Sequence, residues 1–200
     1  MTDPALQRAA GLAALAAAAV GLLYSVSFVV LSRISPAAGG LLSALFLLLG
    51  GLLTVVALSG VYDRRREGRP ALALLVVVVG SAGGLGAAVH GGYDLANALH
   101  PPGTLPSDVP NAIDPRGLLT FGVTGLALLL LGGLLGAVGP GRLALLAGAL
   151  LILVYLARLI VLTPSNPLVL IPAALAGFLV NPAFYVWLGL WLLRPREVVS

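Results

Sequence analysis

The fold is decided by residues 41–70, which read LLSALFLLLGGLLTVVALSGVYDRRREGRP. The first 22 residues of this stretch carry no charge. At a rise of about 1.5 Å per residue, a helix of that length crosses a hydrocarbon layer of about 30 Å. The last eight hold four arginines and a proline, which end the helix and place positive charge at one membrane surface. The stretch therefore predicts a spanning helix followed by a short cytoplasmic loop.

The composition of the whole chain agrees with a membrane protein. Of its 200 residues, 60% are hydrophobic and 9% are charged, too few charges to cover the surface of a soluble domain. The chain has no cysteine, which excludes disulfides, thiolate metal sites and thiol redox chemistry. It also has no lysine, which excludes Schiff-base chemistry. The net charge of +4 comes from arginines in short loops, a pattern that favours membrane orientation over nucleic-acid binding.

Six apolar runs follow one another along the chain, and they predict an all-α bundle of six transmembrane helices in one domain, residues 1–200. The first run is longer than the apolar core of a signal peptide, roughly 7 to 15 residues, so we expect it to remain as a span. We expect a turn at residues 37–40, and an irregular loop at 97–116 because of its prolines. The predicted spans are residues 9–31, 41–62, 71–96, 117–138, 143–162 and 168–193.

The arginines orient this bundle, because cytoplasmic loops retain positive charge. With both termini inside, eight arginines lie on the inner side, Arg33 and Arg116 lie on the outer side, and Arg158 lies within a span. The loop 97–116 then faces outward. The Ala-, Leu- and Gly-rich, all-arginine composition is typical of a high-GC bacterial genome, so we expect the bacterial inner (plasma) membrane. The inner arginines are Arg8, Arg64, Arg65, Arg66, Arg69, Arg142, Arg194 and Arg196.

Polar side chains gather at the outer end of the third run, where residues 90–97 read HGGYDLAN. Counting the helical rise from the middle of each span places His90 about 10 Å, Asp94 about 16 Å and Arg158 about 8 Å above the midplane. His90 and Asp94 are four residues apart and share a helix face. An unpaired arginine in hydrocarbon costs at least about 2.5 to 3.5 kcal/mol, so we predict that Arg158 faces the bundle and pairs with Asp94.

The cluster has three interpretations. In the first, it is an outward-facing polar pocket that binds an anion or a small polar ligand, or that relays a proton. In the second, it is a structural bridge between the third and fifth helices. Alternatively, the Arg158 guanidinium extends to the headgroups and needs no partner. The side chains expected around the cluster are Tyr93, Asn97, Tyr155 and Tyr24.

Asn181 and Pro182 form a second polar feature, near the middle of the last run. Proline removes a backbone donor and displaces the carbonyl of Phe178, so we expect a kink at which Asn181 adds an acceptor. The same residues also suit ordinary interhelical packing. Tyr185, Trp187 and Trp191 follow, and we expect them to anchor the helix at the inner headgroups.

No recognisable catalytic constellation accompanies these features, and we expect no metal and no cofactor. The leading hypothesis is therefore a small membrane protein that binds or transports an ion or small polar ligand through the residues around His90. Its rival is a structural or accessory subunit, in a homo-oligomer or a membrane complex, that docks a partner through glycine-rich helix faces. Gly80 and Gly84 have the spacing that such faces require.

Overall fold

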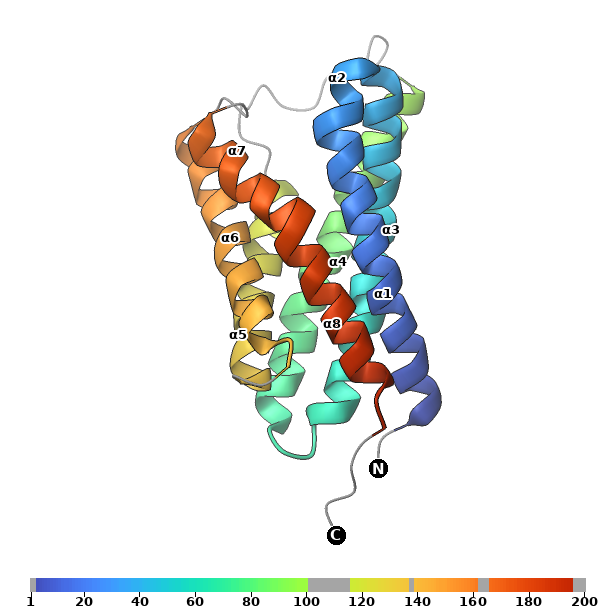
Figure 1. The fold of residues 1–200 in the computed structure, drawn as a ribbon, viewed down its shortest axis with the longest axis vertical. Coiled ribbons are helices and arrows are strands. Elements are labelled where there is room, and N and C mark those ends of the chain that lie inside the picture. The colour runs from blue at the N-terminus through green and yellow to red at the C-terminus, as the bar shows by residue number, and fades with distance from the viewer. Residues whose placement is uncertain (1–2, 101–115, 137–138, 162–165, 196–200) are drawn as a thin grey trace.

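The computed structural model describes residues 3–100, 116–136, 139–161 and 166–195, which are almost entirely helical (Figure 1). Six helices in these ranges are long and apolar enough to cross a membrane, which confirms the all-α, six-span prediction. Three of them contain a π-helical segment, labelled η. In chain order the elements are α1 (Pro4–Val26), η1 (Ser27–Leu31), α2 (Ser32–Ile34), α3 (Pro36–Arg65), α4 (Pro70–Leu99), η2 (Leu118–Val123), α5 (Thr124–Leu135), α6 (Gly141–Ile160), α7 (Pro167–Ala174), η3 (Leu175–Val180) and α8 (Asn181–Leu193).

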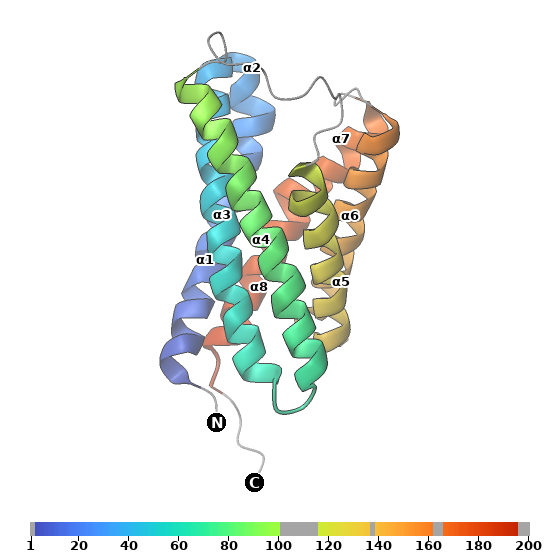
Figure 2. The same cartoon turned by 180° about the vertical axis from the view of Figure 1, so that it is seen from behind.

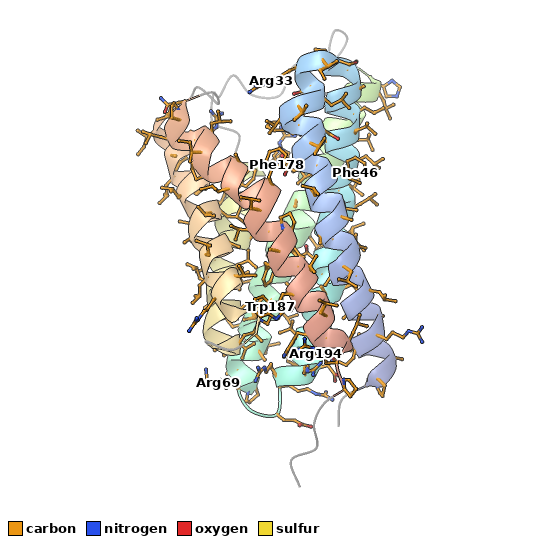
Figure 3. The ribbon with its side chains drawn as sticks, viewed as in Figure 1. Arg33, Phe46, Arg69, Phe178, Trp187 and Arg194 are labelled. Carbon is orange, nitrogen blue, oxygen red and sulfur yellow. The ribbon has the colours of Figure 1, made fainter. Side chains whose placement is uncertain are left out.

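The spans pack as a ring that follows the order of the chain. Each of α1, α3, α4, α5 and α6 packs against the next span, and the last span returns to pack against α1 (Figures 1 and 2). The start of α1 and the end of α8 lie at one end of the bundle, which we call the terminal end. The opposite end, where α2 and α7 lie, is the distal end. Figure 3 shows Arg69 and Arg194 at the terminal end and Arg33 at the distal end.

The outer surface of the ring is apolar, as a lipid environment requires. Large aliphatic side chains on all sides of the bundle are around half exposed, an arrangement that only a hydrocarbon solvent tolerates over so much of a surface. Charged side chains are concentrated near the two ends of the helices (Figure 3). Exposed examples are Leu12, Leu52, Leu74, Val78, Leu126, Leu153 and Leu190.

The packed core fills the terminal half of the ring. Its largest fully buried side chains include Val61, Val76, Leu131, Phe184 and Leu188. Val61 lies near the end of α3 and Val76 near the start of α4, so both lie in the terminal half. Leu131 and Leu188 come from the corresponding parts of α5 and α8. The ring is therefore filled by side chains on the side that holds the termini.

Polar contacts close the terminal end. The carboxylate of Asp63 is 5% exposed, accepts a hydrogen bond from Gln7 Nε2 at 3.0 Å and pairs with Arg66 at 3.2 Å. The Arg64 guanidinium lies 4.5 Å from the centre of the Trp191 ring and donates to the Trp191 carbonyl at 2.6 Å. Cations near a helix C-terminus bind its free carbonyls. Arg64, one of the arginines expected to orient the protein, thus also ties α3 to the end of α8, and Asp63 joins α3 to the start of α1 through Gln7.

Glycines bring the helix backbones together inside the ring. A Cβ atom added to Gly51 of α3 would overlap the carbonyl oxygen of Gly84 in α4, and a Cβ on Gly84 would lie 2.9 Å from the Gly51 oxygen. Gly80 faces Leu58 in the same interface. Small residues permit this close approach of two helices. Gly80 and Gly84 therefore pack against α3 of the same chain. Their spacing, which suggested a docking face for a partner, is explained by this contact.

Two predicted features of the connections are wrong. Residues 37–40 are helical instead of forming a turn, because α3 begins at Pro36, a residue that suits the first helical position. Only Ser35, with φ −140° and ψ 94°, separates α2 from α3. The third span also continues beyond the predicted residue 96, to Leu99. Most of the predicted loop 97–116 lies outside the described residues.

Candidate functional site

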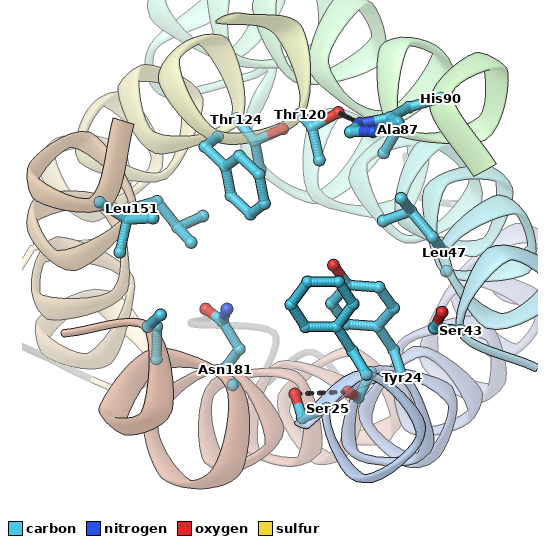
Figure 4. A pocket seen from close by; sticks show the side chains of 18 of the residues that line it. Tyr24, Ser25, Ser43, Leu47, Ala87, His90, Thr120, Thr124, Leu151 and Asn181 are labelled. Atoms are coloured by element: carbon cyan, nitrogen blue, oxygen red, sulfur yellow. Dashed lines mark hydrogen bonds between the residues drawn. The ribbon is translucent and has the colours of Figure 1, made fainter. Parts of the chain in front are cut away.

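The distal half of the ring encloses a cavity of about 490 Å³ (Figure 4). All six spans contribute to its walls, and most of the lining side chains are apolar. Asp94 lines the cavity and its side chain is 41% exposed, so the cavity reaches the surface at the distal end. Binding sites for small molecules commonly have volumes of 300 to 1,000 Å³ and apolar walls with a few directed polar groups. This cavity has those properties.

Each of the three π-helical segments borders the cavity. Phe28 of η1, Thr120 of η2 and Phe178 of η3 all line it. A π-helical turn widens the backbone by one residue, and such turns occur frequently at functional sites. In η3 the wide turn ends one residue before the Asn181–Pro182 pair, and the backbone N–H of Asn181 donates to the carbonyl of Ala176. At the position where a kink is predicted, the helix accommodates the proline with this wide turn.

His90 connects the mouth of the cavity with its wall. Its Nε2 atom lies 3.4 Å from a carboxylate oxygen of Asp94, one turn along α4. Its Nδ1 atom lies 2.9 Å from Thr120 Oγ1 on η2 (Figure 4). The hydrogen bond at Nδ1 and the nearby carboxylate at Nε2 together fix the orientation of the imidazole. The predicted pairing of His90 with Asp94 is present, and Thr120 is an additional partner.

Asp94 does not pair with the predicted arginine. Its carboxylate binds Arg116 at 3.1 Å, whereas Arg158 donates to the carbonyl of Val161 at 3.3 Å, at the end of its own helix. The Arg116 guanidinium also lies 4.1 Å from the centre of the Tyr93 ring. Arg116 lies at the start of the fourth span, beside the end of α4, where it reaches Asp94. A bridge therefore joins the third and fourth spans, instead of the third and fifth.

Most of the predicted site residues nevertheless surround one space. His90, Asp94, Tyr155, Arg158 and Asn181 all line the cavity. Tyr24, expected at the margin of the cluster, extends into it from α1 (Figure 4).

Two of the predicted residues are not part of the cavity lining. Tyr93 stacks on Arg116 at the outer surface, and Asn97 lies farther along α4, beyond the lining residues.

Asn181 projects into the cavity from α8 (Figure 4). Its Oδ1 atom is buried and has no hydrogen-bond partner among the described residues. Buried polar atoms without a partner are rare and costly, and they often mark a place where a missing group belongs. Below it, the hydroxyl groups of Thr54 and Tyr185 lie 2.7 Å apart. Tyr185 lines the cavity inside the ring, so its predicted role as a headgroup anchor is wrong.

Sequence reasoning missed three polar contributors, Arg116, Thr120 and Thr54. Arg116 had a usable signal, because the predicted depth of Asp94 placed that carboxylate at the outer edge of the hydrocarbon, close to the next arginine on the predicted outer side. The two threonines had none, since a threonine within an apolar span usually bonds to its own helix. Thr54 makes such a bond with the Gly50 carbonyl as well.

In the part of the chain that the structure describes, no group of three or more metal-ligating side chains lies together. Comparison with protein-family models, with curated proteins and with solved structures finds no significant match to this chain. The site must therefore be interpreted from its own geometry.

Proposed function

We propose that this multi-pass membrane protein binds, and in a transport cycle carries, a small molecule in the cavity of its distal half. The observation that carries the proposal is the division of the ring into a filled half and a hollow half. The filled half holds Phe184 and its neighbours, and the hollow half holds about 490 Å³ of space walled by all six spans. A helix bundle that needed only stability would lose contacts by leaving such a space open.

The arginine distribution supports an orientation in which the terminal end is cytoplasmic and the cavity opens to the exterior or periplasm. Within that proposal, the protein resides in the inner membrane of a bacterial cell. The last span adds support for transport, because it combines Pro172, a π-helical segment and Pro182 beside the cavity. Interrupted helices of this kind border the binding sites of many secondary transporters.

The rival function, an accessory subunit docked through glycine-rich faces, has weaker support. Gly80 and Gly84 pack against α3 within the chain. Other surfaces remain available for a homo-oligomer or a membrane-complex partner, but none of the described features favours one of them.

The proposal is tested by thermal unfolding of the purified protein with a panel of small anions, cations, alcohols and aromatic compounds. Gly21 provides the decisive variant, because it lines the cavity and a Cβ atom there meets no atom within 4 Å. Leucine at position 21 will project into the cavity and occupy part of its space. Gly133 is the matched control, since it is exposed on α5 and also has no neighbour within 4 Å.

A compound that binds the cavity at 100 times its Kd stabilises the protein by about 2.7 kcal/mol. It will raise the melting temperature of the wild type and of Gly133→Leu, and it will leave that of Gly21→Leu unchanged. Equal shifts in both variants would place binding elsewhere. A panel without any effect on the wild type would count against a ligand-binding function.

A further inference from the structure

The aromatic side chains of the chain are concentrated around the cavity. Four of its five phenylalanines and three of its five tyrosines line it. The aromatic residues that do not line it are Tyr62, Tyr93, Phe184, Trp187 and Trp191. In a bundle built mainly from alanine, leucine, glycine and valine, this enrichment gives the cavity a surface unlike that of the packed half.

Two of these rings already form a stacked pair. Tyr24 and Phe28 lie one helical turn apart, with ring centres 5.7 Å apart and planes inclined by 13°. Phe121 lines another wall of the cavity, from η2. Offset-stacked or edge-to-face contacts between aromatic rings are worth about 0.5 to 1.5 kcal/mol beyond the area that they bury. The cavity walls therefore favour a flat ring over a flexible hydrocarbon tail.

Asn181 supplies the polar contact for such a ring. Its side chain points into the same space from α8 (Figure 4), and its buried Oδ1 atom has no partner among the described residues. A carboxamide both accepts and donates hydrogen bonds. It can therefore accept from a hydroxyl group or donate to a carbonyl oxygen carried on a ring.

Other classes of ligand fit these observations less well. A metal ion would need several strong oxygen or nitrogen ligands, and the described residues hold no group of three or more His, Cys, Asp or Glu side chains. An organic cation would meet Arg158 in the cavity wall and Arg116 beside its mouth. Among the described residues, Asp94 is the one carboxylate that lines the cavity, and it already binds Arg116.

We propose that the cavity binds an uncharged planar ring compound bearing a hydrogen-bonding oxygen, the chemistry shared by phenols, quinols and quinones. The ring packs between Phe121 and the stacked pair of Tyr24 and Phe28, and its oxygen bonds to the Asn181 carboxamide. This inference rests on the proposed ligand-binding function and narrows it to one class of compound.

Three probes of similar carbon skeleton separate the contribution of ring stacking from that of the hydrogen bond. 1-Naphthol has a flat ring and an oxygen, naphthalene has only the ring, and decahydro-1-naphthol has only the oxygen. Binding is measured by equilibrium dialysis against protein in lipid nanodiscs, with empty nanodiscs as the baseline. We expect 1-naphthol to bind roughly two- to tenfold more tightly than either of the others, the factor that one hydrogen bond or one aromatic contact supplies.

Variants identify the residues. Asn181→Leu keeps the side-chain size and removes the carboxamide. It will therefore weaken the binding of 1-naphthol roughly two- to tenfold and leave the binding of naphthalene unchanged. Phe121→Leu keeps an apolar side chain and removes the ring, so it will weaken both. Trp187→Leu, at an aromatic residue outside the cavity, is the control and will alter neither. Melting temperatures of the three variants show whether each remains folded.

The comparison of the three probes on the wild type is decisive even where a variant fails to fold. If decahydro-1-naphthol binds as tightly as 1-naphthol, the inference of a planar ring is overturned while ligand binding in the cavity stands. If Gly21→Leu binds all three probes like the wild type, the cavity is not the site and both proposals fail. If no probe binds above the empty-disc baseline, the ring inference is overturned, and the proposed function then depends on other compounds of the panel.

Discussion

Replacing Gly21 by leucine in the absence of any ligand tests whether the distal half is hollow. Gly21 lies on the face of α1 that also carries the buried residues Ala14, Ala17 and Ser25, so a side chain added there points into the ring. A Cβ atom at this position meets nothing within 4 Å. We predict that Gly21→Leu raises the melting temperature more than the control Gly133→Leu does.

The magnitude follows from the surroundings of the two positions. The gain in helix propensity from glycine to leucine is at most about 1 kcal/mol in each span, so the comparison of the two variants cancels it. Moving a leucine side chain from water to an apolar environment is worth about 1.5 to 3 kcal/mol. A micelle already shields part of that side chain when the protein unfolds. We therefore expect the gain in unfolding free energy of Gly21→Leu to exceed that of Gly133→Leu by about 1 kcal/mol. For a chain of this size, that corresponds to about 2–4 °C.

The measurement is thermal unfolding of the ligand-free variants in the same detergent, monitored by the loss of the near-ultraviolet circular dichroism signal. If the space near Gly21 were filled instead, the added leucine would overpack it and cost about 1 to 3 kcal/mol. Gly21→Leu would then melt several degrees below Gly133→Leu. The sign of the difference between the two variants therefore decides whether the reasoning is correct.

Three further substitutions test the packing and the mouth of the cavity by the same unfolding measurement. Gly51→Ala places a methyl group against the Gly84 carbonyl and should destabilise the protein by roughly 1 to 3 kcal/mol, whereas Gly40→Ala, with no atom within 4 Å, should not; equal effects would show that α3 and α4 are farther apart. Phe184→Ala empties a fully buried site and should cost about 3 to 5 kcal/mol; a loss below 1 kcal/mol would contradict a packed terminal half. Asp94→Asn removes the bridge to Arg116. Because that carboxylate is 41% exposed, the loss of unfolding free energy should stay below about 1 kcal/mol and shrink further in high salt. A larger, salt-independent loss would show that the bridge is buried.

The fold was predictable from the sequence because the bilayer imposes a strong constraint. A helix is one of the few structures that satisfies its own backbone in hydrocarbon, so the length of each apolar run largely determines a span. The ends of the spans were less predictable, since proline both ends helices and begins them. Pro36 illustrates this ambiguity, because it starts α3 where a turn is predicted.

The candidate site was predictable only in part. Depth along a helix follows from the rise per residue, and it correctly brought His90 and Arg158 to one cavity. Which helices are neighbours does not follow from depth, and therefore Asp94 binds Arg116 of the fourth span instead of Arg158 of the fifth. The cavity itself has no local signature, because a hollow half and a packed half are built from the same apolar residue types. The aromatic side chains at its walls become a pattern only once the spans form a ring.

Cysteine accessibility measures the division into a hollow half and a sealed half most directly, because the chain has no cysteine of its own. Ser43 and Ser59 lie on the same helix, but Ser43 lines the cavity and Ser59 does not. A membrane-impermeant thiol reagent added outside intact cells should label Ser43→Cys and leave Ser59→Cys unlabelled. Equal labelling of the two variants, or labelling of Ser43→Cys only from the cytoplasmic side of inverted vesicles, would contradict an outward-opening cavity above a sealed core.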